Sequence, residues 1–203
     1  MNLIKINADN PNPKKIDIIT DVLRNGGVII YPTDTVYAIG CLINNSEGLK
    51  RIIQFKSNKK DELTLSFLFN NISSISDYVV NFDNRTYRLL NKYLPGPYAF
   101  ILKPKIKFPK PFQRRKKLGV RICEHPVTKS ILSNLNSPLV TSSLPDPDDL
   151  VKYTTDPNKI FNYWKNKVDL IVDSGISGNI PSTVVDLTQK NPIIMRIGKG
   201  EFR

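Results

Sequence analysis

Residues 28–37 read Val-Ile-Ile-Tyr-Pro-Thr-Asp-Thr-Val-Tyr, and this stretch indicates an α/β fold with a ligand site at a strand end. Its first four residues are β-branched or aromatic, which is typical of a short buried strand. Pro32 removes a backbone donor and ends the strand. Thr33, Asp34 and Thr35 follow at its carboxyl end, where open α/β sheets bind ligands. Their two hydroxyls suit the ammonium or hydroxyl group of a small polar ligand; the alternative is a polar turn.

Helical and strand segments alternate along the chain, which favours a sheet covered by helices. Apolar residues three or four apart predict helices over 14–25, 46–56, 83–93, 127–135 and 156–164. Ser46 and Asp83 are the expected N-caps of the second and third helices. Short β-prone runs predict strands over 28–31, 64–69, 98–102, 118–122, 139–142, 168–172, 183–187 and 193–197.

The bulk composition is that of an ordinary globular chain. The 203 residues, 40% apolar and 24% charged, suit a single domain over 1–203. We expect no secretory signal and no membrane span, because no apolar run approaches the roughly 18 residues that a bilayer requires. The two cysteines, Cys41 and Cys123, form no disulfide framework, so a cytoplasmic location is the expectation.

The formal net charge is +12, which suggests a polyanionic partner. The abundance of Lys, Asn and Ile is also what AT-rich codons supply, so both explanations stay open. Residues 103–117 hold eight basic residues, no acid and three prolines. This segment is either a solvated loop or a clamp for an RNA backbone. In the second case the RNA-binding residues are Lys110, Arg114, Arg115, Lys116 and Lys117.

Several kinds of catalytic site are excluded. The chain has no Gly-rich phosphate-binding loop of either common pattern. His125 is the only histidine, and no His/Cys cluster is present, so we expect no protein metal site. His125 precedes Pro126 and a predicted helix, where a capping or surface role is expected.

Hydroxyls and cations at strand ends remain as candidates. Ser142-Ser143 and Ser182-Thr183 flank predicted strands, where each pair is either a turn or part of a ligand site. Arg121 and Arg196 lie inside apolar strands, and a guanidinium there needs an anionic partner or a wet face. Two such arginines favour carboxylate or phosphate recognition. The alternative is two outward-facing positions on a half-exposed sheet.

Taken in order, six segments resemble the YrdC/YciO family, whose characterised members are threonylcarbamoyl-AMP synthases. The segments are GGVIIYPTDTVYAIGC (26–41), LPGP (94–97), GVRI with HP (119–126), PLVTSS (138–143), STVVDL (182–187) and MRIG (195–198). The resemblance implies a twisted mixed sheet with helices around a basic concave cavity. It also implies a nucleotidyltransferase that converts L-threonine, bicarbonate and ATP into threonylcarbamoyl-adenylate and pyrophosphate, with Mg²⁺ accompanying the ATP.

The resemblance further implies partners and site residues. The threonylcarbamoyl group would pass to an adenosine of tRNA, so tRNA or double-stranded RNA and other tRNA-modification proteins are expected partners. Carried over to this sequence, the threonine-binding residues are Thr33, Thr35, Arg121, Ser142 and Ser182. The ATP-binding residues are Lys56, Lys59, Ser143, Thr183 and Arg196.

Two departures from the synthase pattern fall on the nucleotide side. The family has Lys-x-Arg-Pro where this chain has Lys56-Ser57-Asn58-Lys59, and it has Ser-x-Asn where this chain has Ser142-Ser143-Leu144. Residues 64–67 and 142–145 are more similar to the YciO branch. The alternative function is therefore a YciO-like protein that binds double-stranded RNA or tRNA with weak or no synthase activity.

Overall fold

The computed structural model describes residues 2–55, 65–105, 116–144 and 153–203, which form one α/β domain. In these residues ten strands make a single mixed sheet of order β1-β8-β2-β3-β7-β4-β6-β5-β9-β10. The strands are β1 (Leu3–Lys5), β2 (Ile29–Tyr31), β3 (Ala38–Leu42), β4 (Ser66–Leu68), β5 (Tyr98–Leu102), β6 (Leu118–Arg121), β7 (Leu139–Ser143), β8 (Leu170–Asp173), β9 (Thr183–Asp186) and β10 (Ile193–Arg196). The helices are α1 (Pro13–Arg24), α2 (Ser46–Gln54), α3 (Ile72–Ile75), α4 (Asn84–Tyr93), α5 (Pro126–Leu135) and α6 (Pro157–Trp164).

One face of the sheet carries a continuous apolar cluster across five neighbouring strands. Cys41 pairs with Val140, Val140 with Phe67, Phe67 with Val120, and Val120 with Phe100. All five side chains belong to the same buried cluster, to which α2, α3, α4 and α6 also contribute. These helices therefore cover one face of the sheet from one end to the other.

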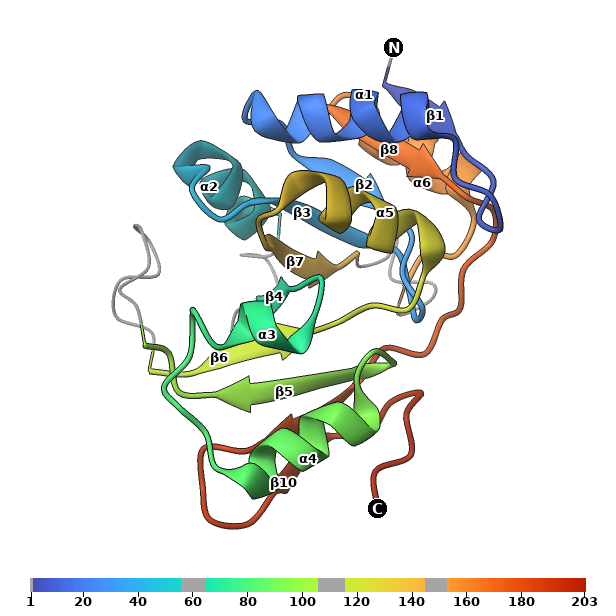
Figure 1. Ribbon diagram of the computed structural model, residues 1–203. Helices are drawn as coiled ribbons and strands as arrows, with labels where there is room; N and C mark the ends of the chain where they lie inside the picture. Colours follow the sequence, from blue (N-terminus) through green and yellow to red (C-terminus); the bar gives the residue numbers. More distant parts are fainter. Residues whose placement is uncertain (1, 56–64, 106–115, 145–152) are drawn as a thin grey trace.

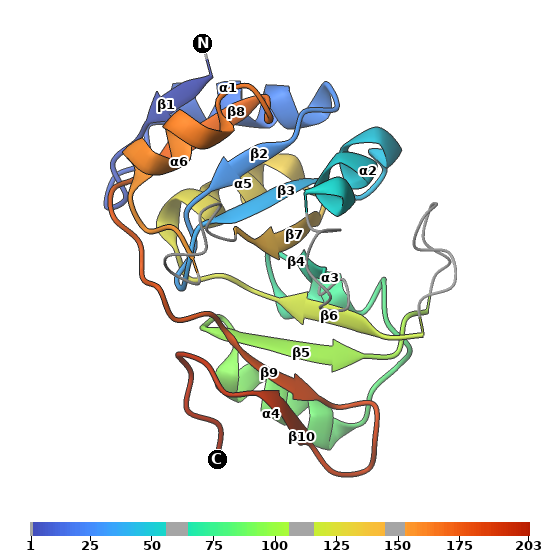
Figure 2. The same ribbon diagram turned by 180° about the vertical axis from the view of Figure 1, so that it is seen from behind.

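In the described part of the chain, helices cover the opposite face at one end only. There Leu42, Leu139 and Leu68 are in register and pack in a second cluster beneath α1 and α5. Leu68 is next paired with Arg121, which lies on the same face beyond the helices. Neighbouring strands twist by roughly 20°, so ten strands turn the sheet by about half a revolution. Figure 1 accordingly shows α1 and α5 in front of the upper strands but α4 in front of the lower ones, and Figure 2 shows the reverse side.

Local sequence explains where the helices begin and end. Asp83 caps α4 by accepting from Thr86 N, as predicted, but the cap of α2 is Asn45, one residue before the predicted Ser46. Gly26 takes φ 83° after α1, which suits a residue without Cβ. No helix in the described ranges is long and apolar enough to cross a bilayer.

Candidate functional site

The uncovered part of the second face is a cavity of about 430 Å³. This volume lies within the range of ligand pockets in proteins, which is roughly 300–1,000 Å³. Strands β4 to β7, with β9 and β10, supply its wall, and the wall is rich in cations and hydroxyls. Its polar side chains are Ser66, Lys116, Lys117, Arg121, Thr141, Ser142, Ser143, Ser182 and Arg196. No carboxylate lines it among the residues that the structure describes.

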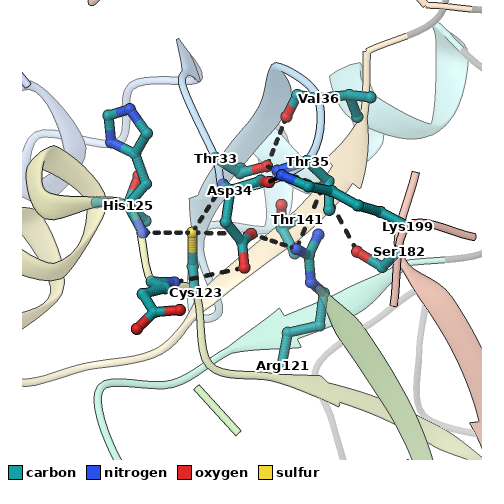
Figure 3. Close-up of polar contacts among 12 residues, drawn as sticks. Thr33, Asp34, Thr35, Val36, Arg121, Cys123, His125, Thr141, Ser182 and Lys199 are labelled. Carbon is teal, nitrogen blue, oxygen red and sulfur yellow. Dashed lines mark hydrogen bonds and ion pairs between the residues drawn. The ribbon is translucent and has the colours of Figure 1, made fainter. Parts of the chain in front are cut away.

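The turn after β2 lies against this wall, and its two threonines have different roles (Figure 3). The Thr33 hydroxyl donates to Val36 O at 2.6 Å, and Thr35 N donates to the Thr33 hydroxyl at 3.2 Å. Thr33 therefore holds the turn in shape. The Thr35 hydroxyl lies 3.5 Å from Ser182 Oγ and accepts from Arg121 Nη2 at 3.4 Å. Thr35 is thus in contact with two residues of the cavity wall.

Arg121 is paired with Asp34 in a nearly buried ion pair. The distance from Nη2 to Asp34 Oδ1 is 2.9 Å, and the two side chains are 8% and 12% exposed. Both polar contacts that Arg121 makes with described residues use Nη2, and its buried Nε has no partner among them. A guanidinium has five donors. Arg121 therefore keeps donors for a ligand carboxylate while Asp34 compensates its charge.

Asp34 is held by the segment that follows β6. Its Oδ1 accepts from the Cys123 thiol at 3.3 Å, and its Oδ2 lies 3.5 Å from Glu124 N. Burial and the Asp34 charge raise the pKa of Cys123 to about 12, so the thiol stays protonated and donates. Lys199 Nζ donates to the backbone oxygen of Asp34 at 2.6 Å and ties the far end of the chain to this turn.

Arg196 and the two lysines supply the rest of the positive charge. Arg196 donates through Nε and Nη2 to Ser182 O, at 3.1 and 2.8 Å. Burial and the nearby Arg121 charge lower the pKa of Arg196, so a bound anion would stabilise its charged form. Lys117 Nζ is 2.7 Å from Asp186 Oδ2, whereas Lys116 forms no ion pair with a carboxylate in the described ranges.

Most of the predicted site residues that the structure describes lie in one place. Five of them line the cavity: Arg121, Ser142, Ser143, Ser182 and Arg196. The predicted RNA-binding residues Lys116 and Lys117 line the same cavity. Five other predicted residues lie outside the described residues: Lys56, Lys59, Lys110, Arg114 and Arg115.

Three predicted residues in the described ranges, Thr33, Thr35 and Thr183, are not among those that line the cavity. Thr35 contacts the lining residues Arg121 and Ser182. Thr33 is used within the turn, and the Thr183 hydroxyl donates to Gly200 O and accepts from Gly198 N. Sequence reasoning missed Asp34 as the partner of Arg121, although a strand arginine requires an anion and Asp34 lies in the most polar turn. His125 occupies the N-cap position of α5 without a side-chain cap bond.

Comparison with known proteins places the chain in a family. Residues 21–198 match the family model named Sua5/YciO/YrdC, whose description is "Telomere recombination". The chain belongs to the Sua5/YciO/YrdC family. It is 34% identical over 201 residues to the uncharacterized protein YciO of Escherichia coli strain K12, covering 98% of this chain and 96% of that one. The crystal structure of E. coli YciO superposes with a TM-score of 0.90.

Synthases of this Sua5/YciO/YrdC family are more distant. The threonylcarbamoyl-AMP synthase of Bacillus subtilis is 24% identical over 195 residues, covering 92% of this chain and 54% of that protein. The crystal structure of P. abyssi Sua5 complexed with L-threonine has a TM-score of 0.84 at 22% identity, covering 98% of this chain and 58% of that one. The mixed twisted sheet predicted from the sequence is confirmed by these structures.

Proposed function

We propose that this protein joins L-threonine, bicarbonate and ATP into threonylcarbamoyl-adenylate, releasing pyrophosphate, as a step in tRNA modification. The observation that carries the proposal is the cavity, whose lining includes three residues predicted for threonine and two predicted for ATP. Arg121 and Ser182 line it and both contact Thr35. Arg196 and Lys116 add positive charge, and neither forms an ion pair with a carboxylate of the described residues. P. abyssi Sua5, which shares the fold, was crystallised with L-threonine.

The chemistry needs positioning and charge stabilisation more than a nucleophilic side chain. The threonine amine reacts with bicarbonate to give a carbamate and water, and a carbamate oxygen then attacks the α-phosphorus of ATP while pyrophosphate leaves. The free donors of Arg121 would orient the threonine carboxylate, and Arg196 would offset the charge that develops on the phosphates. Asp34 and Asp186 already accept from cations. Mg²⁺ is therefore proposed to enter with the triphosphate.

The test is pyrophosphate release from ATP, measured with and without L-threonine and bicarbonate. Release that depends on both is the expected result. Replacing Arg196 by Ala should reduce kcat/KM for ATP by about tenfold or more, because one charged hydrogen-bonding group is lost. Lys14→Ala, an equal charge change on α1, should have no effect. Absence of release from folded protein at saturating substrates would refute the proposal.

A second candidate is RNA binding without turnover, and Leu144 favours it. Where the synthase pattern has an amide, the Leu144 side chain is fully buried in the apolar cluster. It therefore offers no donor to a nucleotide. This candidate predicts tRNA or double-stranded RNA binding whose affinity falls steeply with salt, without pyrophosphate release. Binding that does not change with salt, or no binding, would count against it.

A further inference from the structure

A second cavity, of about 450 Å³, lies at the beginning of α4. One wall is the first turn of α4, and the loop joining β9 to β10 forms the other; Figure 1 shows that loop passing beside the start of the helix. We propose that this groove is a nucleotide-binding site separate from the first cavity. The base would lie on its apolar floor and the phosphate on its cationic rim.

The two cavities lie on opposite faces of the sheet. Ile101 of β5 lines the first cavity, and the next residue, Leu102, lines the second. Successive side chains of a strand point to opposite faces. A ligand in the second groove is therefore separated from Arg121 and Arg196 by the sheet itself, and the groove goes beyond the function proposed above.

The rim of the groove carries three cations from three different segments. Arg85 comes from α4, Lys103 follows β5, and Lys190 comes from the loop before β10. All three are exposed, and none forms an ion pair with a carboxylate of the described ranges. Arg85 Nη1 donates to Lys190 O at 3.3 Å, which holds the loop against the helix. Asp83 is the acid in this lining, and its carboxylate already accepts from Thr86 N at 2.8 Å.

The floor beneath these cations is apolar. Phe82, Leu89 and Leu187 line it and are partly buried against the core cluster. An apolar surface that includes an aromatic ring suits a base or another planar ring, and cations at its edge suit a phosphate. The side chains of Asn81 and Gln189 are also in the lining and offer amides to the edge of a base. A base joined to a phosphate matches all three features, whether it is a free nucleotide or one unit of an RNA strand.

The experiment uses the whole protein labelled with ¹⁵N. AMP and a short single-stranded oligoribonucleotide are titrated separately, and backbone amide shifts are followed by NMR. The variant Arg85→Ala/Lys190→Ala removes two rim cations. The matched control Lys14→Ala/Lys129→Ala removes two exposed cations from α1 and α5. Val80→Tyr narrows the groove at a half-exposed position while its charges stay in place.

We expect shifts at residues 81–86 and 187–190, and an affinity at least about tenfold weaker in both groove variants but not in the control. Binding of AMP identifies a free nucleotide as the ligand, and binding of the oligonucleotide alone identifies an RNA strand. Shifts confined to the first cavity, equal weakening in the control, or no effect of Val80→Tyr would overturn the proposal. Pyrophosphate release should be unchanged in the groove variants, so this proposal and the proposed synthase activity fail independently.

Discussion

Replacing Asp34 by Asn tests whether the turn after β2 is anchored by charge. Asn keeps the shape of the side chain, and its oxygen can still accept from Arg121. The substitution removes the negative charge that compensates the guanidinium, and it turns one oxygen into an NH₂ group. That group would face Glu124 N, which is 3.5 Å from Asp34 Oδ2, so a donor would meet a donor.

The structure sets the expected magnitude. Removing one partner of a buried ion pair costs about 3–5 kcal/mol, because the remaining charge is left uncompensated. The side chains of Arg121 and Asp34 are 8% and 12% exposed, and Nη2 lies 2.9 Å from Oδ1. Water therefore screens this ion pair little. Because Asn retains one hydrogen bond, the lower end applies. We expect Asp34→Asn to lower the free energy of unfolding by about 3 kcal/mol.

Urea unfolding at neutral pH measures this change in wild type, Asp34→Asn, Arg121→Met and the double variant. The double variant should be more stable than the sum of the single changes predicts, by about 1–3 kcal/mol. Glu47→Gln is the control, because its ion pair with Lys50 is exposed and should contribute less than about 1 kcal/mol. The reasoning fails if Asp34→Asn costs no more than this control, or if the double-mutant cycle shows no coupling.

Three further predictions follow from burial and close packing. Burial raises the pKa of both Cys41 and Cys123 to about 12. Iodoacetamide at about pH 8 should therefore leave both thiols intact in the folded protein and alkylate both in urea. Labelling without denaturant would contradict this. Burial lowers the pKa of His125, so as the pH drops this histidine is protonated in the unfolded state before it is protonated in the folded state. The free energy of unfolding should therefore fall between about pH 7 and about pH 5. His125→Gln should make the free energy of unfolding depend less on pH in this range, and an unchanged dependence would rule the effect out. Gly198→Ala would place a Cβ against Pro181 O, closer than a real Cβ approaches. Scanning calorimetry should therefore show a lower Tm, with a loss of about 1–3 kcal/mol in the free energy of unfolding. An unchanged Tm would mean that the segment moves freely.

The sequence predicted the long elements of the fold because their patterns are periodic or strongly β-prone. It missed β3, although this strand is central and fully buried, because Ala38, Gly40 and Cys41 have no β-branched side chains. It also missed β1, whose three residues are too few for a pattern. The parallel pairing of β1 with β8 joins residues far apart in the chain and leaves no local signal.

Site residues could be predicted where a residue type is unusual for its position in a strand. Which residues contact one another in the site was harder to predict. Arg121 was identified because a strand arginine is unusual, and Ser182 because it adjoins a strand end. The choice of Asp34 as the partner of Arg121 depends on tertiary structure, because the two residues are 87 positions apart in the chain. Ser182 and Thr183 are adjacent at the start of β9, and because successive side chains point to opposite sides, only Ser182 lines the cavity.

The contacts around Asp34 also constrain the order in which the protein folds. Thr35 meets Ser182 across 147 positions of the chain, and Asp34 meets Lys199 across 165. Closing such long loops is slow because the entropy is lost before the contacts form. During synthesis, strands β4 to β7 of the cavity wall can pair before residues 182 and 199 emerge, but the turn at Asp34 and Thr35 cannot yet be held by them. The turn after β2 should therefore be among the last parts of the molecule to become ordered.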